Sequence, residues 1–395
     1  TLGIGAIIVC ILVFIIGVAR LFFAADHFSL SDPATVQELL NLFMIAVSLA
    51  IAAVPEGLPA VVTISLAGGM REMVKRHALI RKLASVETLG SVTVICSDKT
   101  GTLTQNQMTV TRLWADGKFI TVTGSGYEPH GEFLNGDQKI DFKAYRGVGT
   151  ALWIGALNND AQLELSGESD GKPTYRIVGD PTEGSILVAA EKAGTSVEEL
   201  QKAYPRVQEI PFDSERKRML TIHAIKQPVD DDISPFTSAD REKGYIIAVK
   251  GAPDVVLNLC THRLKMDNDV EPMTEEARQE ILAANDAMTK DALRVLGVAY
   301  RIVPQMPEDI TPEALEKDLI FAGLIGMIDP ARPEVKTALA EAKTAGIRTI
   351  MITGDYPNTA RAIAEEIGLL EPGHQVLTGA DIEDKSEEEM REIVK

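Results

Sequence analysis

Asp98 is the residue whose neighbours most clearly suggest chemistry. It ends the β-branched run SVTVICSD (91–98) and begins the string DKTGTLT (98–104). An acid at the carboxyl end of a buried strand lies where open α/β sheets place reactive groups. Its carboxylate can act as a nucleophile and form an acyl phosphate, and the following glycine and threonines predict a tight turn that can hold a phosphoryl group. The alternative is that Asp98 only caps this turn.

A cation site is predicted in the apolar stretch 39–70, where PEGLP (55–59) interrupts the helical pattern. Broken backbone within a membrane is tolerated only where it is packed in protein or lines a cavity. Glu56 is the only acid of this stretch, and its carboxylate together with freed carbonyls would form an oxygen cage for a hard cation. We expect these carbonyls to belong to Ile51, Ala52 and Val54. The alternative is a neutral Glu56 that bonds a neighbouring helix.

Lys250 and Phe212 are candidates for holding a nucleotide. Lys250 ends the strand-like run YIIAVK and precedes a glycine, so its ammonium group and the backbone can approach a phosphate or the edge of an adenine. Phe212 is apolar within the strongly charged stretch PFDSERKRM, which suits a ring stacked on adenine. The alternatives are an ordinary exposed lysine and a phenylalanine packed in the core.

The composition excludes several classes of function. Asp and Glu total 57 and Lys and Arg total 39, so the net charge of −18 argues against a nucleic-acid partner. Three cysteines without a CxxC pair exclude a disulfide scaffold, and six scattered histidines without HExxH argue against a zinc hydrolase.

The N-terminal part predicts a transmembrane hairpin over residues 1–76. Its two apolar spans, about 2–25 and 36–70, are each long enough to cross a lipid bilayer. Five basic residues follow the second span: Arg71, Lys75, Arg76, Arg81 and Lys82. The positive-inside rule therefore places residues 71–395 in the cytoplasm and predicts a multi-pass integral membrane protein.

The remainder predicts an α/β protein of two domains. SVTVICSD and GIRTIMITGD (346–355) read as strands of one doubly wound domain in two pieces, 77–109 and 329–395. Between them, 110–328 reads as an inserted α+β domain. DPARPEVKTALAEAKTAG predicts an amphipathic helix that stops at Gly346. The chain begins inside a span and ends inside a helical pattern, so we expect it to be part of a longer protein.

DKTGTLT resembles the phosphorylation motif of the P-type cation-transporting ATPases. PEGLP (55–59), KGAP (250–253), DPARPEV (329–335) and TGD (353–355) also resemble motifs of that family, in its order and spacing. The resemblance covers the whole chain, and Pro59 is typical of the calcium pumps. It implies ATP-driven transport of a cation, Ca²⁺, through an aspartyl phosphate at Asp98. It also implies a haloacid-dehalogenase-like phosphorylation domain without its C-terminal half, and a nucleotide-binding insertion.

The resemblance further implies roles for individual residues. In the catalytic site Asp98 would be joined by Lys99, Thr100, Thr353 and Gly354, with Asp98 and Thr100 also holding Mg²⁺. The positions that match nucleotide contacts are Glu183, Phe212, Lys217, Lys250, Gly251, Arg294 and Asp355. Many calcium pumps have an arginine two residues after the phenylalanine, but this chain has Ser214, so Arg216 could replace it.

The expected partners are ATP, a cation, the lipid bilayer and the rest of the pump, namely an actuator domain and further membrane helices. Three other functions stay open. The chain could belong to a pump for Na⁺ or Mn²⁺, or to a membrane-tethered nucleotide sensor without catalysis. It could also be a haloacid-dehalogenase-type phosphatase, although those enzymes usually carry a second aspartate where this chain has Thr100.

Overall fold

The structure, a computed structural model, describes residues 2–24, 33–53, 57–169, 171–228, 233–236, 244–383 and 385–393. The chain divides into two compact units, Thr1–Thr93 and Val94–Lys395. Each unit has its own secondary structure and its own internal contacts.

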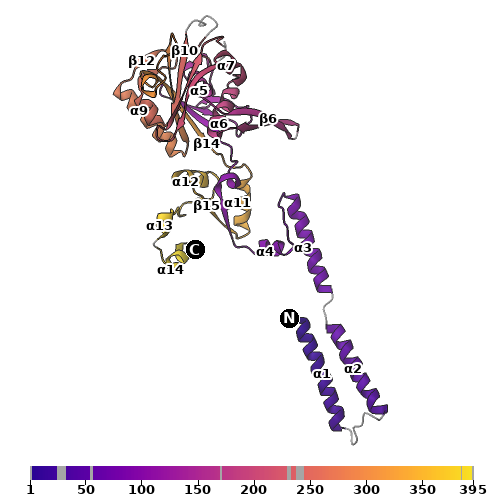
Figure 1. Ribbon diagram of the computed structural model, residues 1–395. Coiled ribbons are helices and arrows are strands. Elements are labelled where there is room, and N and C mark those ends of the chain that lie inside the picture. Colours follow the sequence, from indigo (N-terminus) through magenta and orange to yellow (C-terminus); the bar gives the residue numbers. More distant parts are fainter. Residues whose placement is uncertain are drawn as a thin grey trace. The chain divides into compact units, whose positions relative to one another are not determined.

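The first unit is helical because its sequence has long uncharged apolar runs. Helices α1 (Leu2–Ala24) and α2 (Pro33–Ala53) lie side by side and run in opposite directions (Figure 1). The rings of Phe14 and Phe43 meet edge to face with centroids 6.2 Å apart. A Cβ on Gly17 would lie only 2.7 Å from Leu42, so a glycine lets the two helices approach closely here.

The second apolar stretch is divided between two helices. Helix α2 ends at Ala53, α3 (Gly57–Lys75) follows, and α4 (Ala84–Gly90) completes the unit. Val54, Pro55 and Glu56 lie outside the described residues, and Gly57, Leu58 and Pro59 of the predicted interruption at PEGLP form the start of α3. By length and composition, the stretch Pro33–Lys75, which contains α2 and α3, is the one candidate membrane span among the described residues, and Ile7–Phe23 is a shorter apolar helix.

The second unit is built around a mixed sheet with eleven strands in its described part. The strand order is β5-β4-β3-β2-β14-β13-β10-β9-β8, with β11 beside β14 and β12 beside β11. The strands are β2 (Thr109–Ala115), β3 (Lys118–Val122), β4 (Phe133–Asn135), β5 (Gln138–Lys139), β8 (Arg206–Asp213), β9 (Arg218–Ala224), β10 (Tyr245–Gly251), β11 (Cys260–Leu264), β12 (Val270–Pro272), β13 (Arg294–Val303) and β14 (Leu319–Ile328). Neighbouring strands are antiparallel except β11 and β14. A separate hairpin consists of β6 (Gln162–Ser169) and β7 (Lys172–Val178).

Both faces of the large sheet are covered by helices (Figure 1). In β10, Ile246 and Ala248 belong to one hydrophobic core and Ile247 and Val249 to the other, which is the two-residue period of a strand. Residues of α5 (Arg146–Leu157), α6 (Pro181–Lys192) and α7 (Val197–Ala203) fill the first core. Residues of α8 (Pro253–Asn258) and α9 (Glu275–Lys290) fill the second, and α10 (Pro312–Leu315) precedes β14.

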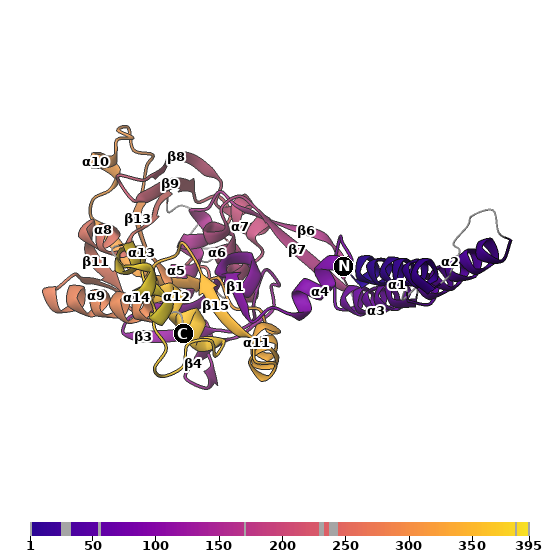
Figure 2. The same ribbon diagram turned by 90° about the horizontal axis from the view of Figure 1, so that it is seen from below.

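A second, small sheet carries the DKTGTLT string. Strands β1 (Val94–Asp98) and β15 (Arg348–Ile352) pair in parallel, as predicted, and lie side by side in Figure 2. Strand β15 ends at Ile352, so residues 353–355, which were predicted as the end of this strand, follow it instead. Helix α11 (Val335–Thr344) contacts β15, and Gly346 after it has a φ of +74°, which confirms the predicted helix stop. Helices α12 (Pro357–Glu366), α13 (Gly379–Glu383) and α14 (Glu387–Ile393) complete the unit.

Two chain segments connect the small sheet to the large one. An isolated antiparallel bridge pairs Thr104 with Ala331, and the Gln105 amide donates to the Pro330 carbonyl at 3.0 Å. The chain therefore leaves the small sheet and returns to it at neighbouring points. The large sheet begins at Thr109 and ends at Ile328, between these two segments.

His223 on β9 gives the large sheet a pH-dependent stability. Its Nδ1 donates to the Tyr204 carbonyl and its Nε2 accepts from the Thr221 hydroxyl, both at 2.9 Å, so the ring fits as the neutral form. Burial lowers the pKa of His223 from 6.5 to about 4. The unfolded chain takes up a proton on this histidine near pH 6.5, whereas the folded chain does so only near pH 4. The free energy of unfolding should therefore fall by about 3 kcal/mol as the pH is lowered from 6.5 to 4.

Urea unfolding of the parent chain and of His223→Gln, followed by fluorescence, checks this prediction. Both tryptophans, Trp114 and Trp153, are buried in the large-sheet region and report on it directly. Between pH 6.5 and pH 4 the stability of the parent should fall more steeply than that of the variant. Equal slopes would show that His223 does not titrate as described.

Candidate functional site

Asp98 lies at the carboxyl edge of the small sheet with its carboxylate exposed to solvent. It pairs with Ile352 across the parallel ladder, which brings Thr353 to the same edge. Its side chain makes no capping hydrogen bond to the turn Lys99–Leu103. The alternative that Asp98 only caps this turn is therefore wrong, and its carboxylate oxygens can accept a reacting group.

An ion pair holds the two strand ends beside Asp98. The Lys99 ammonium lies 2.6 Å from Oδ2 of Asp355, and the Lys99 side chain is only 4% exposed. The Asp355 amide donates to Oγ1 of Thr353 at 3.2 Å, so this hydroxyl can still donate its own proton. Gly101 has a φ of +75°, which favours glycine at this point of the turn. Asp98, Lys99, Thr353 and Asp355 are thus brought together from two segments far apart in the sequence.

Asp329 lies where the chain returns to the small sheet. Its Oδ2 accepts from the Thr104 hydroxyl at 2.5 Å, and its Oδ1 accepts from the Gln107 amide at 3.0 Å. Helix α11 begins only at Val335, so Asp329 does not cap that helix. Its carboxylate instead joins the outgoing and returning segments.

Lys250 lies in a buried polar cluster at the end of β10. Its ammonium bonds the Asn158 carbonyl and lies 2.5 Å from Oε1 of Glu183, in the first turn of α6. Oε2 of Glu183 accepts from the Asp160 amide at 2.9 Å. Burial holds the pKa of Lys250 below its ordinary value, although the Glu183 carboxylate acts in the opposite direction. Lys250 is therefore neither an exposed lysine nor a free cation, and it fixes Glu183 at the base of the site.

The other predicted nucleotide residues lie on the strand ends around this cluster. Gly251 pairs with Arg218 on β9, and a Cβ at Gly251 would lie 2.4 Å from the Lys217 carbonyl, which explains the need for glycine. Phe212 on β8 is 64% exposed, so the alternative of core packing is wrong for this ring. Arg294 begins β13 and bonds the hydroxyl of Thr182, the residue before Glu183, at 2.9 Å.

Two features of this region were not anticipated from the sequence. Asn158 is fully buried, and its side-chain amide donates to the backbone carbonyls of Met219 and Ala248. These two hydrogen bonds connect the residue after α5 to β9 and β10. Arg216 does not extend into the space left by Ser214, because it pairs with Glu316, together with Arg218. The polar type of Asn158, directly after the apolar run of α5, is a local signal of its role, whereas Glu316 lies among other charged residues and has no such signal.

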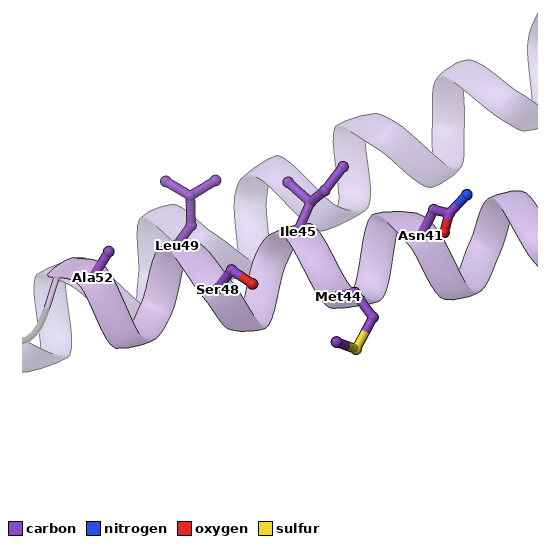
Figure 3. Close-up of a pocket in the computed structure, with 6 residues that line it drawn as sticks. All are labelled: Asn41, Met44, Ile45, Ser48, Leu49 and Ala52. Carbon is purple, nitrogen blue, oxygen red and sulfur yellow. The ribbon is translucent and has the colours of Figure 1, made fainter.

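The predicted cation site is described only in part. Ile51 and Ala52 lie in the last turn of α2, whereas Val54 and Glu56 lie outside the described residues. A shallow hollow follows one face of α2 toward Ala52, lined by Asn41, Met44, Ile45, Ser48, Leu49 and Ala52 (Figure 3). Asn41 and Ser48 are polar side chains in an apolar helix and were not predicted as part of the site. Within the described ranges, no cluster of three or more His, Cys, Asp or Glu residues could hold a metal ion.

Comparison with known proteins connects these sites to one family. Residues 148–334 match the family model described as the cytoplasmic N domain of P-type ATPases. The chain is 42% identical over 357 residues to a calcium-transporting ATPase of Bacillus subtilis, covering 90% of this chain and 38% of the relative. It is 40% identical over 392 residues to calcium-transporting ATPase 1 of Lactococcus lactis, covering 99% of this chain and 39% of the relative. It is 43% identical over 339 residues to the cation-transporting ATPase pma1 of Synechocystis, covering 85% of this chain and 35% of the relative.

The chain spans less than two-fifths of the length of these relatives. The similarity nevertheless extends over nearly all of the chain, from the apolar helices through both sheets. With a matching N-domain model and relatives of about 40% identity along most of its length, the chain is similar to the P-type cation-transporting ATPases.

Proposed function

We propose that this chain is the part of a calcium pump that binds ATP and accepts its γ-phosphoryl group on Asp98. The observation that carries the proposal is the exposed, uncapped carboxylate of Asp98 beside the Lys99–Asp355 ion pair and the Thr353 hydroxyl. Two relatives named as calcium transporters support Ca²⁺ as the cargo. Pumps for Na⁺ or Mn²⁺ are the alternatives that the experiments below distinguish.

In the proposed reaction a carboxylate oxygen of Asp98 attacks the γ-phosphorus of ATP. A bond forms between this oxygen and phosphorus while the bond to the bridging oxygen breaks, so ADP leaves with the electron pair. The Thr353 hydroxyl and the Gly354 amide would donate to the phosphoryl oxygens, and Lys99 and Asp355 would hold both strand ends in place. Thr100 occupies the position where the related phosphatases usually carry their general acid, which favours a lasting acyl phosphate over rapid hydrolysis.

Mg²⁺ would be held by Asp98 and Thr100 together with oxygens from ATP and water. Both residues offer hard oxygen ligands on an exposed turn, which fits this ion, although they are too few to bind it alone. When bound, the ion offsets negative charge on the transferring phosphoryl group.

The nucleotide would bind at the edge of the large sheet formed by the ends of β8, β10 and β13. Phe212 would stack on adenine, and Lys250 and Gly251 would form the base of the pocket, together with Glu183. Lys217, Arg294 and Asp355 would contact the phosphates and ribose. The exposed ring of Phe212 and the bonded Glu183–Lys250 pair support this assignment.

The domain boundaries follow from this assignment. We assign 77–109 and 329–395 to a haloacid-dehalogenase-like phosphorylation domain and 110–328 to the nucleotide-binding domain. Residues 1–76 would form a two-helix transmembrane hairpin in a multi-pass pump, with 71–395 in the cytoplasm. The polar Asn41–Ser48 face of α2 would then turn toward further helices of the pump, because polar side chains in a bilayer usually face protein.

The first test concerns the acyl phosphate. The protein that contains this chain is incubated with labelled ATP, quenched in acid and treated with hydroxylamine, which cleaves acyl phosphates. Label should appear in the parent, be released by hydroxylamine, and be absent from Asp98→Asn. Asp381→Asn, an exposed acid that bonds Thr378, serves as the control and should be labelled like the parent. Label that resists hydroxylamine, or persists in Asp98→Asn, refutes the assignment.

The second test concerns the adenine pocket. Removing the Phe212 ring should weaken ATP binding by about 1–3 kcal/mol, the scale of aromatic stacking on a base. Calorimetric titration of Phe212→Ala with ATP measures this loss. Phe119→Ala is the matched control, because Phe119 is 40% exposed and lies on β3, near the opposite end of the sheet order from β8. If both variants bind ATP like the parent, the pocket lies elsewhere.

The third test concerns the transported ion. A carboxylate within a bilayer is costly unless a cation or a proton neutralises it, so Glu56 should couple phosphorylation to the ion. Glu56→Gln should abolish Ca²⁺-activated phosphorylation from ATP while leaving ATP binding intact. Glu38→Gln, at an acid within α2 that precedes the apolar stretch 39–70, should keep the calcium response. An unchanged calcium response in Glu56→Gln would exclude this site. A parent activated by Na⁺ or Mn²⁺ but not by Ca²⁺ would overturn the ion assignment.

A further inference from the structure

Glu316 is a buried carboxylate outside the proposed nucleotide contacts. It follows α10, and its side chain is only 3% exposed. Its Oε1 bonds Nη2 of Arg216, and its Oε2 accepts from Nε and Nη2 of Arg218 at 2.9 and 2.6 Å. Burying a carboxylate costs free energy unless charged partners bond it, and here Arg216 and Arg218 compensate for the buried charge of Glu316.

Arg216 lies in the turn between β8 and β9, and Arg218 is the first residue of β9. Within this turn the Asp213 carboxylate accepts from the amides of Glu215 and Arg216, and the Lys217 amide donates to the Asp213 carbonyl at 2.7 Å. Lys217 has a φ of +54°, a conformation that a lysine rarely adopts unless neighbouring contacts impose it. Nη1 of Arg218 also donates to the Arg216 carbonyl at 2.9 Å. Glu316 therefore holds this turn through Arg216 within it and through Arg218 directly after it.

The same turn lies between the proposed nucleotide contacts. Phe212 immediately precedes it, and Lys217 is its last residue before β9. The Lys217 carbonyl accepts from the Ala252 amide at 3.0 Å, which links the turn to Gly251 at the end of β10. Any shift of the turn would therefore move the aromatic ring and the lysine relative to the base of the pocket.

We propose that Glu316 is a positioning residue for nucleotide binding, which acts through Arg216 and Arg218 and does not touch the nucleotide. It fixes the β8–β9 turn so that Phe212 and Lys217 face the nucleotide together. The inference rests on the ATP site proposed above.

The test compares ATP binding by the parent chain, Glu316→Gln and a matched control. Glu316→Gln should weaken ATP binding about tenfold, the scale of one lost hydrogen-bonded charge. Adenosine should be weakened by a similar factor, because the ring position is what changes. Glu209→Gln is the control: it removes the carboxylate that bonds Arg206 at 2.6 Å on the same strand, before the turn, and should bind ATP like the parent.

Two further readouts separate positioning from a general loss of stability. Hydrogen exchange at the amides of Arg216 and Lys217 should become faster in Glu316→Gln, while exchange in β10 stays unchanged. Adding Arg216→Gln to Glu316→Gln removes one unpaired charge, so the thermal stability should recover while ATP binding stays weak.

Three results would overturn the inference. They are parental ATP affinity in a folded Glu316→Gln, unchanged exchange in the turn, and ATP affinity that recovers together with stability in the double variant. A parent that binds no ATP at all would instead refute the proposed ATP site, and the inference with it. A parent that binds ATP and is weakened by Phe212→Ala but not by Glu316→Gln would refute the inference alone.

Discussion

The hydrogen bond between the Thr104 hydroxyl and the Asp329 carboxylate joins residues 225 positions apart, and the arrangement of the second unit, Val94–Lys395, depends on it. A chain that leaves a small parallel sheet after Asp98 can insert a large domain only if its outgoing and returning segments meet. Asp329 on the returning segment holds the two together, because its carboxylate accepts hydrogen bonds from the Thr104 hydroxyl and from the Gln107 backbone amide on the outgoing segment. Strand β15 can then pair with β1, and Thr353 reaches the edge where Asp98 lies.

The large-sheet region contains buried charged side chains, and each of those described below is bonded to a group of opposite charge. Lys250 and Glu183 neutralise one another at the end of β10, and the Asn158 carbonyl takes a further hydrogen bond of the ammonium. Glu316 is neutralised by Arg216 and Arg218 in the same way. Removing one member of such a set leaves a buried charge without a partner, which costs more than the loss of an exposed ion pair. These sets therefore fix the strand ends on which the proposed nucleotide site is built.

Much of this arrangement could be predicted from local patterns in the sequence. The strand-like runs that became β1, β10 and β15, and the helix stop at Gly346, depend on neighbours within a few residues. The strand-end position of Asp98 follows from the same kind of signal. The end of β15 at Ile352 was missed because Thr353–Asp355 continue the sequence pattern, although their hydrogen bonds form a turn.

Long-range pairs could not be predicted in this way. Arg216 was expected near a phosphate, but its partner Glu316 lies 100 positions along the chain, and nothing local indicates that pair. Lys250 was predicted as a nucleotide contact from its place at the end of a strand, but its burial beside Asn158 and Glu183 depends on contacts that only the folded sheet provides. The interruption at PEGLP was predicted from its prolines and glycine; α2 ends at Ala53 before this motif, and α3 begins at Gly57 within it.

The account depends most directly on covalent phosphorylation of one carboxylate. Reduction with borohydride after incubation with ATP converts an aspartyl phosphate to homoserine, which peptide mass spectrometry can locate. We predict homoserine at position 98 in the peptide that carries KTGTLT, dependent on ATP and on the transported cation. Homoserine at another position, or ATP hydrolysis without any reduced residue at 98, would contradict the account.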